Sequence, residues 1–278
     1  MGRKLRNSYE LVKASVRVLL ADRELLVFPL LSGVASVLVA ATFFFPLFLV
    51  GGFREAAESA GAAGALGVLV FYIVQFTVIY FFNSALVGAA LIRLDGGDPT
   101  VGDGLRIAGE RFGAILGYAV ISATVGVILN TLSEKAGVLG RMAVGLVGLS
   151  WNLATYLAVP VLVARGIGPV DAVKESARLF KRTWGEQVVG TVGMGFAFGV
   201  AGVSLGLFSI ALLAGVGTLA PWLLLPTVLL TVLTWVLFGL AAAALKGIYA
   251  AALFRFADTG EAGWGFERTT LTGAFRPR

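Results

Sequence analysis

The stretch from Gln187 to Leu245 reads QVVGTVGMGFAFGVAGVSLGLFSIALLAGVGTLAPWLLLPTVLLTVLTWVLFGLAAAAL and contains no Asp, Glu, Lys or Arg over 59 residues. About 20 apolar residues in a helix are enough to cross the hydrocarbon core of a bilayer. The stretch is therefore long enough for two crossings, with Pro221 and Pro226 as helix breakers between them. It predicts a helical hairpin inside a membrane and excludes a soluble globular protein.

Four further charge-free runs occur earlier in the chain, at 25–53, 59–92, 112–133 and 142–164. Each is long enough for one crossing. The whole chain of 278 residues is 58% hydrophobic and only 14% charged, which also fits a membrane protein. We therefore predict an all-α, polytopic integral membrane protein whose six transmembrane helices form three hairpins. The expected spans are 25–50, 62–92, 114–132, 142–163, 188–214 and 227–254.

The basic residues predict the orientation of these spans, because Lys and Arg are retained on the cytoplasmic side. Of the 22 Lys and Arg residues, only Arg54, Lys135 and Arg141 fall in the loops expected outside. We expect an inner (plasma) membrane protein with both termini in the cytoplasm. Its parts would be an amphipathic helix at 1–24, a membrane domain at 25–256 and a poorly ordered polar tail at 257–278. The net charge of +6 needs no nucleic acid, since basic residues beside spans orient them and attract anionic lipid head groups.

Short amphipathic segments precede the first, third and fifth spans, at Tyr9–Leu20, Val101–Phe112 and Val170–Phe180. We expect them to be helices at the cytoplasmic face of the membrane. When their first acidic residues are aligned, apolar, basic and small residues also align in four columns. These columns are Val12, Leu105 and Val173; Lys13, Arg106 and Lys174; Ser15, Ala108 and Ser176; and Leu19, Phe112 and Phe180. The pattern indicates either a threefold repeat or three unrelated amphipathic helices beside a membrane.

The ends of the even-numbered spans are also alike. AALIRLDGG at Ala89–Gly97 resembles AALFRFADTG at Ala251–Gly260, so that Arg93 corresponds to Arg255. Arg165 follows the fourth span in a similar place. The repeated unit would be an amphipathic helix, a span outward, a short loop and a span back.

The residue types restrict the chemistry. The chain has no Cys and no His, and every Asp and Glu lies outside the charge-free runs. These facts exclude thiolate and histidine catalysis, and they exclude proton relays through intramembrane carboxylates. A Ser–Lys pair would have to bring Ser204 or Ser209 to Lys246, so an intramembrane enzyme is the weakest hypothesis. We predict a protein that is not an enzyme and needs no cofactor.

The candidate site residues are the few polar side chains expected at membrane depth: Gln75, Asn83, Asn130, Asn152 and Lys246. Such residues usually face other helices or a cavity. The amides could line a solute path or form hydrogen bonds between helices. Lys246 could attract an anion in a cavity, or it could extend its ammonium group to the cytoplasmic boundary.

Glycines in the fifth span form two small-xxx-small pairs, Gly195 with Gly199 and Gly202 with Gly206. Such pairs let helix backbones approach closely in lipid. We expect them to pack helices within one bundle; association with a second copy or another membrane protein is the alternative.

Two blocks resemble a known family: LVKASVRVLLADRELLVFPLLSG at Leu11–Gly33 and VPVLVARGIGPVDAVKESARLFKRTWGEQVVG at Val159–Gly190. They are similar to uncharacterised prokaryotic inner-membrane proteins with six predicted spans, a domain of unknown function. The resemblance implies one full-length membrane domain and carries no site residues. The residue types favour a scaffold or accessory membrane component of unknown role. A channel or transporter for a small solute, an anion or a lipid is the alternative.

The predicted topology can be tested with single cysteines, because the chain has none of its own. Cysteines at Ala56 and Thr218 should react with an impermeant thiol reagent added outside cells. Cysteines at Gly166 and Thr259 should react only after the membrane is opened. External labelling at Thr259 would contradict the six-span arrangement.

Overall fold

A computed structural model describes residues 2–49, 61–184 and 193–267, and these residues are mostly helical and contain no β-strand. This confirms the all-α prediction. The elements are α1 (Gly2–Ala21), the 3₁₀ helix η1 (Arg23–Leu26), α2 (Val27–Leu49), α4 (Gly61–Leu94), α5 (Val101–Glu110), α6 (Phe112–Lys135), α7 (Val138–Ala154), α8 (Ala158–Arg165), α9 (Pro169–Trp184), α10 (Gly193–Leu219), the 3₁₀ helix η3 (Pro221–Leu223) and α11 (Leu224–Thr259).

Six segments within the described residues are long and apolar enough to cross a membrane. They are Arg23–Pro46, Leu66–Leu94, Phe112–Lys135, Val138–Arg165, Phe198–Leu219 and Pro221–Thr259. Each overlaps one of the six spans expected from the sequence. By length and composition, the chain is therefore a multi-pass membrane protein.

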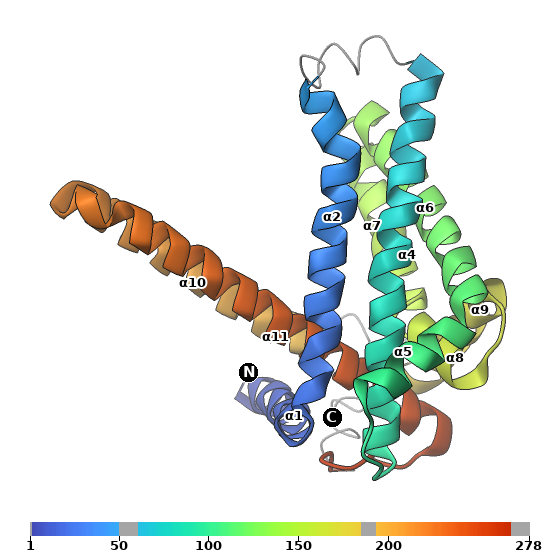
Figure 1. Ribbon diagram of the computed structural model, residues 1–278. Helices are drawn as coiled ribbons and strands as arrows, with labels where there is room; N and C mark the ends of the chain where they lie inside the picture. Colours follow the sequence, from blue (N-terminus) through green and yellow to red (C-terminus); the bar gives the residue numbers. More distant parts are fainter. Residues whose placement is uncertain (1, 50–60, 185–192, 268–278) are drawn as a thin grey trace.

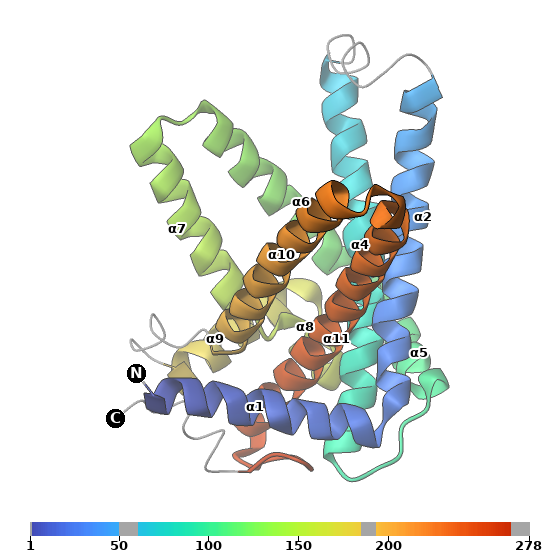
Figure 2. The same ribbon diagram turned by 90° about the vertical axis from the view of Figure 1, so that its left-hand side faces the viewer.

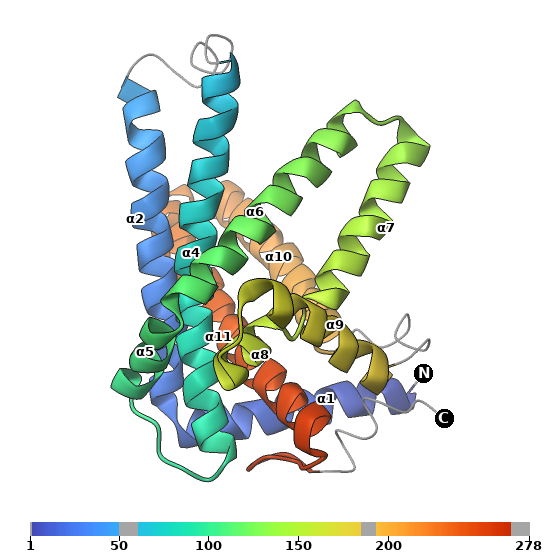
Figure 3. The same cartoon turned by 90° about the vertical axis from the view of Figure 1, so that its right-hand side faces the viewer.

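The long helices lie in neighbouring pairs: α2 with α4, α6 with α7, and α10 with α11 (Figures 1 and 2). The pairs come together at one end of the molecule, which we call the base. There α1, α5, α8 and α9 join the C-terminal ends of α4 and α11 (Figure 3). Toward their other ends, which we call the tips, the pairs diverge. The fold is thus closed at the base and open between the tips.

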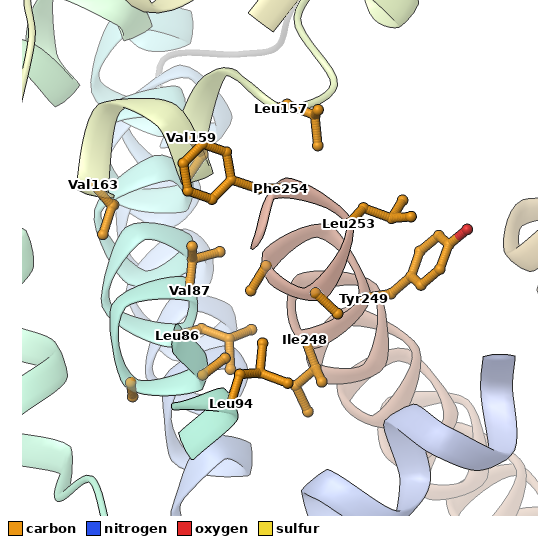
Figure 4. Close-up of a cluster of buried hydrophobic side chains, with 14 of the residues drawn as sticks. Leu86, Val87, Leu94, Leu157, Val159, Val163, Ile248, Tyr249, Leu253 and Phe254 are labelled. Carbon is orange, nitrogen blue, oxygen red and sulfur yellow. The ribbon is translucent and has the colours of Figure 1, made fainter. Parts of the chain in front are cut away.

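The buried core lies at the base. Figure 4 shows apolar side chains of α4, α8 and α11 meeting there, among them Leu86, Val163 and Leu253. Helix α1 completes the core with Leu11, Ala14 and Val18. Each fully buried leucine or valine contributes about 1.5–3 kcal/mol where water would otherwise reach it. This packing holds the three pairs together.

Nearer the tips the pattern is reversed. Ser209 is the only buried residue among 198–219, the part of α10 whose side chains are described. Its hydroxyl accepts a hydrogen bond of 3.2 Å from the indole Nε1 of Trp235 on α11. Large apolar neighbours such as Leu207 and Ile210 are exposed. Apolar side chains on the outside and a polar pair within the hairpin are what lipid hydrocarbon requires.

The fourth span is interrupted at residues 155–157, between α7 and α8, where the sequence predicted a continuous helix over 142–163. Pro160 explains the break. In an unbroken helix its ring would clash with the carbonyl group of Tyr156, whereas proline is accepted in the first turn of a new helix. The N–H group of Leu157, freed by the break, donates a hydrogen bond of 3.0 Å to the buried hydroxyl of Ser176 on α9. Helix α9 therefore stabilises the interruption, because it provides the acceptor for this N–H group.

The three short helices α1, α5 and α9 share one burial pattern in the alignment made from the sequence. Ser15, Ala108 and Ser176 are all completely buried. The aligned cations Lys13, Arg106 and Lys174 are all exposed, and the apolar residues before them are half-buried. Each short helix also precedes a pair of long helices. The fourth column differs, because Leu19 is buried, Phe180 half-buried and Phe112 exposed. Burial is therefore shared in three of the four aligned columns.

Left-handed glycines follow the even-numbered spans at the base: Gly96 after α4, Gly166 after α8 and Gly260 after α11, with φ of 90°, 62° and 75°. This conformation suits glycine because it has no β-carbon. At Gly166 an added β-carbon would also lie 2.5 Å from the guanidinium carbon of Arg111. A cysteine there would be strained, so Thr259 is the better of the two positions for labelling at this end of the molecule.

Ion pairs join these three helix ends. Arg255 of α11 donates to Asp95, which follows α4, at 2.7 Å. Arg165 of α8 donates to Asp258 of α11 at 2.6 Å. Arg165 also pairs with Glu175 of α9 at 2.9 Å. Arg93, Arg165 and Arg255 thus all lie near the C-terminal ends of even-numbered spans. Arg165 and Arg255 each connect one pair of long helices with another.

The tail differs in part from the sequence prediction. Helix α11 continues to Thr259, and the chain that follows packs against the base. There the Trp264 N–H donates to the Leu94 carbonyl at 2.9 Å, the guanidinium of Arg93 lies 4.8 Å from the Trp264 ring centroid, and Phe266 is buried. Residues 257–267 are therefore part of the packed structure. Ala56, the side chain of Tyr9 and residues 268–278 lie outside the described residues.

We expect measurable coupling between Arg165 and Asp258. Each side chain is about one-third exposed, so a double-mutant cycle with Arg165→Gln and Asp258→Asn should give about 0.5–1 kcal/mol. The free energy of unfolding would be measured in a mild neutral detergent. The matched control is Lys174 with Asp171, a pair that is 69% exposed at both ends and should give almost no coupling. Equal coupling in the two cycles would contradict a connecting role for Arg165.

Candidate functional site

A cavity of about 650 Å³ lies above the packed core, between α4, α11 and the broken fourth span. Its wall is mostly apolar, with a few polar side chains among Phe, Leu, Val, Pro and Ala. This is the usual composition of a site for a small organic molecule, and the volume lies within the range of about 300–1,000 Å³ for such sites. Leu86, Val87 and Val159 belong both to the core and to this wall (Figure 4).

Three of the five polar residues singled out from the sequence line this cavity: Asn83 on α4, Asn152 on α7 and Lys246 on α11. They lie more than 60 residues apart in the sequence, and the fold brings them to one place. Neither amide side chain makes a hydrogen bond to another described residue. The sequence left two interpretations for these amides, a cavity lining or hydrogen bonds between helices. The structure places both amides on a cavity wall.

Close contact between α4 and α11 brings Asn83 near Lys246. Gly247 makes this approach possible: an added β-carbon would lie 2.4 Å from Cδ2 of Leu86 and 3.5 Å from Oδ1 of Asn83. The residue next to Lys246 thus lies against the residue pair Asn83 and Leu86. A larger side chain at 247 would push the two helices apart.

Lys246 is the only charged residue among the described residues that line the cavity. No described acidic side chain lies within ion-pair distance of it. Its Nζ atom lies 5.8 Å from the ring centroid of Phe198 on α10, a weak cation–π contact. The Lys246 side chain is therefore exposed, and its charge is not neutralised by a described acidic residue.

The interrupted fourth span forms another side of the cavity, through Leu153, Thr155, Tyr156, Val159 and Pro160. Irregular backbone at membrane depth is tolerated only where it is buried in protein or lines a cavity. Val159 and Pro160 belong to the first turn of α8, whose N-terminal end carries a partial positive charge. The break thus places the C-terminal end of α7 and the N-terminal end of α8 side by side at the cavity wall.

The other two polar candidates lie elsewhere. Asn130 on α6 donates a hydrogen bond of 2.8 Å to Glu134 of its own helix. Gln75 on α4 is not part of the cavity wall, and its buried Oε1 has no partner among the described residues. Neither Asn130 nor Gln75 therefore lines the cavity with Lys246.

The glycines of the fifth span pack against α11. β-Carbons added at Gly202 and Gly206 would both lie 3.7 Å from an aromatic ring, that of Phe238 and that of Trp235 respectively. A β-carbon at Gly199 would meet nothing within 4 Å. The surroundings of Gly195 lie outside the described residues. Contact within the hairpin therefore accounts for the second glycine pair.

Sequence reasoning missed several polar residues of the wall: Ser32, Tyr80, Tyr118, Thr155, Tyr156 and Tyr249. Tyrosines in a hydrophobic run look like ordinary packing residues, and nothing in the pattern of residues distinguishes these four. Thr155 and Tyr156 had a usable signal, because Pro160 within a predicted span marks a possible break four residues earlier. Its consequence, an interruption that borders a cavity, needs the tertiary structure.

The described wall of the cavity carries groups that can bind a ligand. In the described part of the chain, no three or more acidic side chains gather where they could hold a metal ion. The wall contains no carboxylate to serve as a base, and Ser209, one of the serines considered beside Lys246, instead accepts a hydrogen bond from Trp235. The site offers one cation, two amides and several hydroxyl groups in an apolar surrounding.

Comparison with known proteins gives a family and no function. Neither the curated proteins nor the solved structures contain a match to this chain. A family model, described as a family of unknown function (DUF6159), matches residues 62–266, which include all of the cavity except the part formed by α2. The chain therefore belongs to this family of unknown function.

Proposed function

We propose that this protein binds a small molecule of the membrane in the cavity between α4, α7, α8 and α11, as a carrier or transporter would. One observation carries the proposal: Asn83, Asn152 and Lys246 come from three different helices, line one cavity, and have no hydrogen-bond or ion-pair partner among the described residues. Unsatisfied polar groups at membrane depth are costly. A bound molecule that accepts hydrogen bonds would remove this cost.

The open arrangement of the hairpins supports the same proposal. A scaffold gains from a continuous packed interior, whereas here the pairs diverge toward the tips (Figure 2). None of the residues of α7 is buried, although α7 contributes Asn152 to the cavity. A molecule dissolved in the bilayer could therefore enter between the hairpins without crossing the packed base.

We propose that the base faces the cytoplasm. The base carries α1, α5 and α9 with their exposed cations, among them Lys13, Arg106 and Arg178. The excess of Lys and Arg at this end has the sign expected for the cytoplasmic side of a bacterial inner membrane. The same cations are placed to meet anionic lipid head groups.

Filling the cavity should release its occupant. Ala243 lines the cavity on α11, and Ala243→Phe would place a ring inside it. The control is Ala211→Phe, because Ala211 is exposed on α10 and lies outside the cavity. Proteins purified in a mild neutral detergent would be extracted with organic solvent, and their bound amphiphiles quantified by mass spectrometry.

We expect about one amphiphile per chain in the wild type and in Ala211→Phe, and a loss of most of it in Ala243→Phe. The melting temperature of each purified variant shows that it is folded. Equal amounts of every amphiphile in all three folded proteins would mean that the cavity is not a binding site.

A further inference from the structure

Resting on the proposed function, we infer that the cavity binds an anionic lipid-like molecule, with its head group on Lys246 and its hydrocarbon chain directed toward the tips. This assignment names the class of ligand. It follows from the charge of the wall, from the levels at which polar and apolar residues lie, and from the side on which the cavity is exposed.

The charge of the wall selects an anion. Lys246 is the single charge among the described lining residues, and the wall contains no acidic residue. A cationic ligand would be repelled by Lys246, and a neutral one would leave the ammonium without a counter-ion. The amides of Asn83 and Asn152 can donate further hydrogen bonds to phosphate or carboxylate oxygens.

The polar and apolar residues lie at two levels. Helices α4, α7 and α11 all run from the tips to the base, so a residue three or four positions earlier lies about one turn, or 5 Å, nearer the tips. At that higher level the lining residues are Ile79 on α4, Leu149 on α7 and Ala243 on α11. Each stands one turn above Asn83, Asn152 or Lys246. On α4, Tyr80 lies three positions before Asn83 and also lines the cavity. The higher level is therefore apolar on α7 and α11 and mixed on α4.

The apolar level is also the exposed one. Leu149 is 51% exposed and Ile79 36% exposed, whereas Leu86, one turn nearer the base than Asn83, is 2% exposed. Below the polar residues the wall is closed on α4 and α11, where Leu86 and Tyr249 are buried. On the side of the broken fourth span it is exposed at both levels, because Tyr156 is 40% exposed. A free inorganic anion would use the polar level and leave the larger apolar wall without a partner. An amphiphile with an anionic head and an apolar chain matches both levels.

The test uses three lipids with the same oleoyl chain and different head groups: lysophosphatidic acid, lysophosphatidylcholine and monoolein. Inorganic phosphate is the fourth probe. Binding to full-length protein in a neutral maltoside detergent would be measured by native mass spectrometry and by the shift in melting temperature. We expect lysophosphatidic acid to bind at least tenfold more tightly than the other two lipids, and phosphate alone to give no shift at millimolar concentration.

Variants of the head-group site complete the test. Lys246→Met should weaken the binding of lysophosphatidic acid about tenfold or more, while Lys246→Arg should retain most of it. The control is Lys174→Met, which removes an exposed cation on α9 outside the cavity and should change nothing. If Lys246→Met does not fold, the comparison of the three lipids on the wild type still decides the question.

The possible failures can be told apart. Equal binding of the three lipids, abolished in Ala243→Phe, would overturn the anionic head group and leave the proposed function standing. An equal shift with phosphate alone would overturn the lipid-like ligand. Binding of no lipid at all, with Ala243→Phe behaving as the wild type, would contradict the proposed function itself.

Discussion

Lipid hydrocarbon offers no hydrogen bonds, so each polar group at membrane depth must find its partner within the protein or in something that the protein binds. Several of the described polar side chains find one inside the protein. The hydroxyls of Thr42, Thr77 and Thr124 donate to carbonyl groups of their own helices, and Trp235 donates to Ser209 between helices. Asn83, Asn152 and Lys246 are different, because they face a shared cavity and lack such partners among the described residues.

The base makes this arrangement possible. Apolar packing between α1, α4, α8 and α11 fixes the helix ends, and ion pairs of Arg165 and Arg255 join them at the surface. Because stability is concentrated there, the pairs need not pack tightly near the tips. Packing at the base also stabilises the interruption before Pro160. There the hydroxyl of Ser176 on α9 accepts the hydrogen bond from the Leu157 N–H group that the broken helix cannot accept. A closed base and diverging tips are what the proposed entry of a ligand from the bilayer requires.

Much of the fold could be predicted from the sequence, because charge-free runs of about 20 residues and basic loops are direct consequences of the bilayer. The amphipathic helices at α1, α5 and α9 also follow from residue spacing. The interruption of the fourth span was missed, since its apolar composition is continuous and only Pro160 marks the break. The ordered part of the tail was missed as well, because the contact of Trp264 with Arg93 and Leu94 depends on tertiary structure.

The candidate site was predicted only as a set of residue types. Composition singles out the polar residues in apolar runs, but it cannot tell which of them share a cavity. Asn130 and Asn152 look alike in sequence, yet one bonds to Glu134 one turn away and the other faces the cavity. The aligned positions of α1, α5 and α9 can also be compared by their burial. Burial is alike in three of the four aligned columns and differs in the fourth, so the repeat stays a prediction.

The central claim is that the cavity at Asn83, Asn152 and Lys246 holds a molecule with an anionic head group. A density map of the wild-type protein in nanodiscs made from native membrane lipids tests it most directly. The account predicts an elongated density with its bulkier end within hydrogen-bond distance of Lys246 Nζ and its thinner end running toward Ile79 and Leu149. A cavity closed by direct hydrogen bonds between Asn83 and Asn152, with no density beside Lys246, would contradict it.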